Sequence, residues 1–227
     1  YTEEPLVVLL DSETARLHWE VLCAPDPINL DAGGDEDDTL MYFWATSRGL
    51  TRQLRTGFAP PPEPPPPGKR LLRVLVIADP AADAPLPGAL EEGILVAELF
   101  ERFNTVYATG MNRVEVVRLF GPHEATRANV LRLLLLKTFD VVHFAGHCVY
   151  DKDPSLSGLV FSDSKRITAN ELSRIDRVPQ FVFANACQSG LTRDQAAQRD
   201  ARLAPTFAEA FFQQGVSNFV CTAWPVG

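Results

Sequence analysis

The sequence lacks basic runs and long apolar runs. Its 21 Lys and Arg residues are outnumbered by 29 Asp and Glu, which gives a formal net charge of −8. An acidic chain without a basic run has no electrostatic footprint for nucleic acid or for an anionic membrane. No apolar run approaches the length that crosses a bilayer. We therefore predict neither nucleic acid nor membrane as a direct partner.

Cysteine is scarce and dispersed. The four cysteines, Cys23, Cys148, Cys187 and Cys221, form no CxxC pair. Four are too few for a disulfide scaffold in a chain of 227 residues. We therefore expect reduced thiols and a cytoplasmic location, where a cysteine is available for metal binding or catalysis. We interpret Cys23 and Cys221 as small buried hydrophobic residues.

Proline, by contrast, is concentrated in one segment. Residues 59–68 contain seven prolines, and such a run favours a stiff polyproline II spacer. We interpret this run as a surface linker, with a ligand for a proline-binding module as the alternative. It divides the chain into an N-terminal extension, residues 1–58, and a main domain, residues 69–227. In the extension we expect strands at 6–10 and 17–23 to form a hairpin.

After the linker, strand and helix patterns alternate. Continuous or near-continuous apolar runs predict strands at 71–78, 114–120, 140–145, 181–186 and 218–224, with a short excursion at 159–162. Helical spacing predicts helices at 88–103, 126–137, 168–175 and 203–214. In the first helix apolar residues lie at helical spacing, Leu90, Ile94, Ala97 and Phe100, and the third helix opens on a capping box of Thr168 and Glu171. The alternation indicates an α/β fold, a mainly parallel sheet flanked by helices on both faces.

Functional groups in such folds gather at the carboxyl ends of the strands. His147 follows the strand predicted at 140–145, and Cys187 follows the strand predicted at 181–186. A free thiol has a pKa of ~8.5, and a neighbouring imidazole raises its thiolate fraction or removes its proton. The imidazole then protonates the leaving amine. The backbone N–H groups of Cys148 and Cys187 are our candidates for holding the oxyanion.

Other roles for these residues are weaker interpretations. His143 lies within its strand and is more often a hydrogen-bonded core histidine. Gly88 and Gly93 have the glycine spacing of a P-loop, but apolar residues follow where Lys and Ser or Thr are needed. A zinc site would take two ligands from one short strand, which suits tetrahedral geometry poorly; its ligands would be His143, His147, Cys148 and Cys187. We expect neither a metal nor a cofactor.

The strand-end motifs resemble those of CHAT domains, the caspase-like peptidases often found with TPR repeats in bacteria. The resemblance is carried by residues 141–147 and 185–190, and it extends to 156–159, 86–89, 222–226, 18–22 and 48–54. It implies a caspase-like fold with an N-terminal β-containing extension and a cysteine endopeptidase with His147 and Cys187 as its dyad. It also implies a protein or peptide substrate, control by a regulatory partner or by additional domains, and a place in bacterial defence and cell-death systems.

Three features depart from the family pattern. Cys148 replaces the usual glycine after the catalytic histidine, and it is either tolerated packing, which we favour, or a redox partner for Cys187. The acidic residues usual after Trp224-Pro225-Val226 are missing. The chain stops at Gly227, before the last strand and helix of the expected fold, so we expect the main domain to be truncated at its C-terminus.

The resemblance also implies where a substrate side chain binds. In caspase-like enzymes the P1 pocket uses the end of the first strand, the residue two before the cysteine and the segment after the fifth strand, which here are Asp79, Asn185 and a region that begins near Trp224. Asp79 favours a basic P1 residue by ion pairing. Alternatively, Asp79 followed by Pro80 caps a turn. The rival to a peptidase is a regulatory or scaffolding domain that keeps the fold without turnover.

Overall fold

The computed structural model describes two units of the chain. The residues it describes are 6–11, 14, 17, 19, 22, 43–47, 49–54, 71–106, 113–149, 156–172, 175, 178–187, 211–212 and 215–221. The units are Tyr1–Gly57 and Phe58–Gly227, and each is considered by itself. The proline-rich linker predicted at 59–68 lies outside the described residues.

The first unit contains a two-stranded parallel sheet. Strand β1 (Leu6–Leu10) pairs with β2 (Leu50–Leu54), which follows the short helix α2 (Trp44–Ser47). The predicted hairpin is therefore wrong. After β1 the side chains of Asp11 and Thr14 cap each other's backbone, because the Thr14 N–H donates to Asp11 Oδ1 (2.8 Å) and Thr14 Oγ1 accepts from Asp11 N (3.0 Å).

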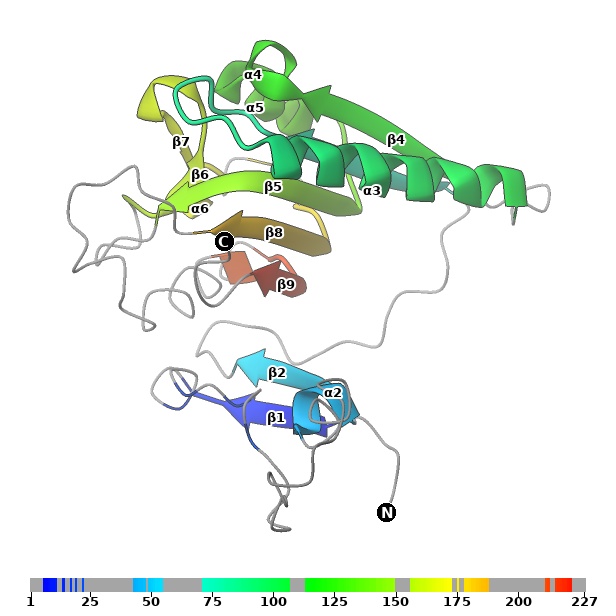
Figure 1. Ribbon diagram of the computed structural model, residues 1–227, viewed down its shortest axis with the longest axis vertical. Coiled ribbons are helices and arrows are strands. Elements are labelled where there is room, and N and C mark those ends of the chain that lie inside the picture. Colours follow the sequence, from blue (N-terminus) through cyan, green and yellow to red (C-terminus); the bar gives the residue numbers. More distant parts are fainter. Residues whose placement is uncertain are drawn as a thin grey trace, which may run out of the picture. The chain divides into compact units, whose positions relative to one another are not determined.

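The second unit is built on a seven-stranded sheet (Figure 1). Five parallel strands lie in the spatial order β4, β3, β5, β8, β9. Two short antiparallel strands, β6 and β7, continue from the end of β5. The bounds are β3 (Leu71–Ala78), β4 (Arg113–Phe120), β5 (Val141–Val149), β6 (Gly158–Val160), β7 (Arg166–Thr168), β8 (Phe181–Cys187) and β9 (Asn218–Cys221). The α/β fold with a mainly parallel sheet is confirmed.

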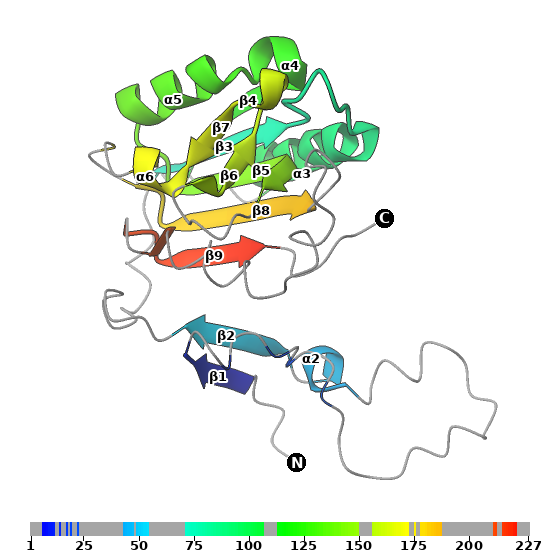
Figure 2. The same ribbon diagram turned by 90° about the vertical axis from the view of Figure 1, so that its left-hand side faces the viewer.

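Helices cover both faces of this sheet (Figure 2). On one face Val74 and Val76 of β3 pack with Ala97 of helix α3 (Pro87–Val106). On the other, Leu75 and Ile77 share a core with helix α5 (Arg127–Leu136). Burial on both faces explains why β3 is continuously apolar from Val74 to Ala78. The remaining helices are α4 (Gly121–Glu124) and α6 (Ala169–Leu172). Within the described ranges, no helix combines the length and apolar character of a membrane span.

Two helical predictions need correction. In α3, Ile94 is 37% exposed, whereas Gly93 and Ala97 are buried, so the inward stripe is rotated from the one expected. The helix predicted at 168–175 is shorter, because Thr168 belongs to β7. One half of its capping box forms, as the Glu171 carboxylate accepts from the Thr168 N–H at 3.1 Å. Of the helix predicted at 203–214, the structure describes residues 211–212, which are helical.

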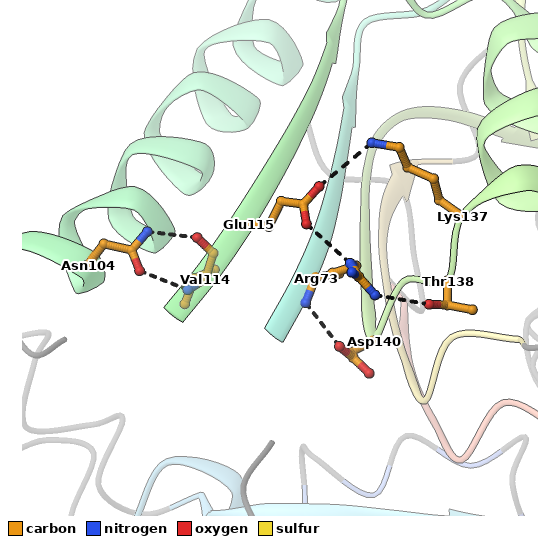
Figure 3. Close-up of polar contacts among 7 residues, drawn as sticks. All are labelled: Arg73, Asn104, Val114, Glu115, Lys137, Thr138 and Asp140. Atoms are coloured by element: carbon orange, nitrogen blue, oxygen red, sulfur yellow. Dashed lines mark hydrogen bonds and ion pairs between the residues drawn. The ribbon is translucent and has the colours of Figure 1, made fainter. Parts of the chain in front are cut away.

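Polar side chains join the amino ends of the strands (Figure 3). The Arg73 N–H donates to Asp140 Oδ2 at 2.9 Å, and its guanidinium reaches Glu115 at 3.1 Å. The side-chain amide of Asn104, near the end of α3, pairs with both backbone groups of Val114 in β4. It donates to Val114 O (2.7 Å) and accepts from Val114 N (2.8 Å). The carboxyl ends of the strands lie at the opposite edge of the sheet, where the candidate site lies.

Candidate active site

The carboxyl ends of β3, β5 and β8 meet at one edge of the sheet. From β3 the chain passes to β4 on one side and then to β5 on the other, so the direction of strand addition reverses between β3 and β5. This reversal is the usual ligand-binding position in open parallel sheets. Asp79 directly follows β3, and His147 lies near the end of β5. The predicted residues therefore lie where the topology favours a site.

His147 and Cys187 are direct neighbours across two strands. The parallel pairing of β5 and β8 runs from Val141 opposite Phe181 to His147 opposite Cys187. Adjacent strands lie about 4.8 Å apart, so the backbone brings the pair within reach of each other. This register is the strongest structural support for the predicted dyad.

The ring of His147 is buried and oriented by the loop that follows β3. Its Nε2 lies 2.7 Å from the carbonyl oxygen of Ala84. A carbonyl only accepts hydrogen bonds, so Nε2 carries the proton and donates. In the neutral ring Nδ1 is then the basic nitrogen, as general-base catalysis requires.

Asp79 closes the same loop. Its backbone has φ 50°, in the left-handed region that a non-glycine residue seldom adopts. Its Oδ1 accepts from Leu86 N at 2.8 Å, and its own N–H donates to Ala145 O at 2.9 Å. The turn-capping role given as the alternative is therefore present. A role in substrate binding stays a prediction.

Cys148 lies in the core. Consecutive strand residues face opposite sides of a sheet, so Cys148 and His147 point to different faces. Cys148 is 2% exposed, belongs to the core cluster that contains Phe144 and Phe161, and lies opposite Leu159 of β6. These surroundings support its interpretation as tolerated packing.

Asn185 contacts a residue that the sequence analysis missed. Its Nδ2 donates to Oε2 of Glu92 at 2.5 Å. Glu92 belongs to the second turn of α3, and its other oxygen, Oε1, lies 3.0 Å from Nε2 of His143. The Glu92 carboxylate thus contacts His143 of β5 and Asn185 of β8, and Asn185 lies two residues before Cys187. The sequence carried no signal for Glu92, because the buried side of α3, marked by Gly93 and Ala97, is set by the contact of the helix with the sheet.

His143 is a buried core histidine, as predicted, but among the described residues its Nε2 lacks the hydrogen bond that the prediction included. Its ring stacks on Phe183 with centroids 5.1 Å apart. Although Nε2 is close to Glu92 Oε1, the two are not aligned for a hydrogen bond, and no other partner exists for Nε2 within the described residues. Burial lowers the pKa of His143, and the nearby Glu92 carboxylate opposes this only in part. The imidazole is therefore neutral at neutral pH.

Metal coordination finds no geometric support in the described part of the chain. No three His, Cys, Asp or Glu side chains converge there as a metal site requires. The zinc alternative rested partly on Cys187, whose backbone alone is described.

Two comparisons with known proteins bear on the chain. A search of curated proteins gave no match. The model of the CHAT-domain family matches residues 2–227, the family that the strand-end motifs resemble. The chain therefore belongs to the CHAT-domain family, a caspase-like family related to the cysteine peptidases.

Proposed function

We propose that the chain is a cysteine endopeptidase that hydrolyses a protein substrate through His147 and Cys187. The observation that carries the proposal is the register of β5 and β8, which makes these residues direct neighbours at the edge where the strand order reverses. The hydrogen bond from His147 to Ala84 adds an oriented ring with a basic Nδ1. Membership of a peptidase-related family supports the same chemistry.

In the proposed mechanism His147 moves protons both when the thioester forms and when it is hydrolysed. The imidazole takes the thiol proton of Cys187, and the thiolate attacks the scissile carbonyl carbon. The backbone N–H groups of Cys148 and Cys187 hold the oxyanion. The imidazolium then protonates the leaving amine as the C–N bond breaks. Water, activated by the same imidazole, hydrolyses the thioester and regenerates the thiol.

We further propose that a regulatory protein partner, or domains outside this chain, control the activity. The few, dispersed cysteines support a cytoplasmic setting, and family membership supports a role in a bacterial defence or cell-death system. Substrate recognition would be by protein contacts, without nucleic acid or membrane. For P1 we propose a basic residue, with Asp79 and Asn185 beside it.

Labelling with a thiol-reactive peptide probe tests the proposal. We expect Cys187 to react ahead of Cys23, Cys148 and Cys221, as mapped by mass spectrometry. His147→Ala should remove this advantage, while Cys221→Ala, the matched control, should keep it. Cys187→Ala should abolish peptide cleavage with an unchanged far-UV circular dichroism spectrum. Labelling that is uniform, or unaffected by His147→Ala, would support the rival regulatory or scaffolding domain.

A further inference from the structure

Glu92 places a carboxylate beside Asn185, two residues before the proposed nucleophile. We infer that Glu92 is a specificity-determining residue, which selects a cationic side chain, lysine or arginine, at the P1 position. The inference rests on the proposed peptidase function and deepens it, because it assigns the substrate class to a residue outside the strand-end motifs.

The position of Asn185 and Glu92 next to the proposed dyad favours a role in binding the P1 side chain. The register aligns Ala78, Ala145 and Asn185 in one row across β3, β5 and β8. This row lies two residues before His147 and Cys187 along their strands. Two of its members carry only methyl groups, so its polar atoms come from Asn185 and from Glu92 above it. A substrate side chain that extends along this face from Cys187 meets these groups next.

The side chain of Glu92 is also accessible to a substrate. The side chain of Glu92 is 28% exposed, whereas that of His143 is 8% exposed. Glu92 therefore sits between the buried imidazole and the solvent side of the cluster. Its carboxylate can reach an incoming group while it stays fixed by Asn185.

The negative charge of the Glu92 carboxylate has no positive partner nearby among the described residues. The two contacts of the carboxylate are a neutral amide and an imidazole that burial keeps neutral. In the described part of the chain, no Lys or Arg forms an ion pair with Glu92 or with Asp79. A partly desolvated carboxylate without a cation attracts an ammonium or a guanidinium strongly.

The buried Nε2 of His143 gives a further observation on the same carboxylate. It is buried, it faces Glu92 Oε1, and it has no aligned partner among the described residues. A buried polar atom left unpaired is costly and calls for an explanation. The same misalignment leaves Oε1 of Glu92 without an aligned hydrogen bond from His143, so this oxygen can accept from a bound cation.

The carboxylate of Asp79 has a mainly structural role. Its Oδ1 is engaged by the Leu86 N–H, so its primary role is to close the loop that orients His147. Glu92 is therefore the main determinant of P1 charge, and Asp79 adds to the negative potential at the end of the same row.

Substrates that differ only in charge at P1 provide the test. Fluorogenic peptides and matching thiol-reactive probes would carry arginine or its neutral isostere citrulline, and lysine or norleucine. For the wild type we expect kcat/KM to be at least about tenfold higher for arginine than for citrulline, the size of one charge-assisted contact. Glu92→Gln should bring this ratio near one by lowering the arginine rate alone. Glu91→Gln, an exposed neighbour on α3, should leave it unchanged.

The possible outcomes distinguish a failure of the Glu92 inference from a failure of the proposed peptidase function. Labelling of Cys187 without preference between arginine and citrulline would overturn the inference and keep the peptidase. An equal loss on both substrates in Glu92→Gln would make Glu92 merely structural. If Glu92→Gln does not fold, Glu92→Asp keeps the charge one methylene shorter and should retain a reduced preference for arginine; loss of both rates together would again overturn the inference. No labelling of Cys187 by any probe would overturn the peptidase and the inference together.

Discussion

The carboxylate of Asp79 and the ring of His147 are linked through one loop. Asp79→Ala leaves the Leu86 N–H unpaired and frees the loop that carries Ala84. We expect a loss of about 1–3 kcal/mol in the free energy of unfolding. Reactivity of Cys187 should fall for every P1 residue, because the histidine loses its anchor. Urea denaturation and probe-labelling rates measure the two effects.

Asp79→Asn is the matched control, since its amide oxygen can still accept from Leu86 N. It should restore stability and the reactivity of Cys187. A P1 profile that changes markedly in Asp79→Asn, with stability intact, would instead give Asp79 the direct pocket role that the resemblance implies.

The buried imidazole of His143 makes stability depend on pH. Its pKa is lowered in the folded state, because burial disfavours the charged ring more than Glu92 favours it. Below its usual pKa of about 6.5 the unfolded chain binds a proton that the folded chain resists, so stability falls as pH drops. His143→Gln should therefore lose less stability than the wild type between neutral pH and the acid side of that range.

The measurement is urea unfolding of both proteins at a series of pH values. Glu92, the charged group that faces His143, is present in both, so its own titration largely cancels in the comparison. His123→Gln, at an exposed histidine of α4, should follow the wild-type curve. Parallel curves for wild type and His143→Gln would contradict the expectation.

The sequence allowed part of the site to be predicted residue by residue. His147 and Cys187 were identified because they end strands, and the register then shows them as neighbours. Glu92 could not be identified in this way. Helical spacing says which residues share a stripe, but the inward direction depends on where α3 meets the sheet, and Ile94 shows that this direction was misjudged.

Close approach of α3 to the sheet depends on one glycine. A Cβ at Gly93 would lie closer to the Cβ of Ala78 than real Cβ atoms come, so the helix would have to move away. We expect Gly93→Ala to lower the free energy of unfolding by about 1–3 kcal/mol. It should also lower the preference for a basic P1 residue, because Glu92 would be displaced from Asn185.

Gly88→Ala is the control within the same helix. A Cβ there meets nothing within 4 Å, so the substitution should be neutral or stabilise by up to about 1 kcal/mol through helix propensity. Urea denaturation of both variants decides the matter. Equal stability of Gly93→Ala and wild type would show that α3 is not held against Ala78.

Element types were easier to predict than element pairing. The strand at 71–78 was confirmed because burial on both faces leaves an apolar run from Val74 to Ala78. Strand β7 was missed, since three residues are too short for any periodicity to show. The partner of β1 was wrong because β2 lies far along the chain, and hydrophobic pattern carries no information on such pairing.

The order of the strands is a property of the whole second unit. Alternating patterns predicted a parallel sheet, but they could not show that β3 lies between β4 and β5. That order depends on which helix crosses on which face, and it creates the reversal beside which Asp79 and His147 lie. The site is therefore a consequence of topology as much as of motif.

Both core clusters belong to the second unit alone. Among the described residues, their members fall between Leu72 and Cys221, and none comes from the first unit. Because a hydrophobic core is the main source of stability, residues 58–227 should fold without the first unit. We expect this fragment to unfold cooperatively in urea and to keep selective labelling of Cys187.

Substitution in the first unit of the full chain provides the complementary measurement. Leu10 is the buried residue that ends β1, so Leu10→Ala should destabilise that unit by about 2–5 kcal/mol. Hydrogen exchange followed by mass spectrometry should then show faster exchange in β1 and β2, with β3, β5 and β8 unchanged. If protection of β5 and β8 falls equally, or if the fragment 58–227 shows no cooperative transition, the two units fold as one, and the catalytic edge depends on the extension.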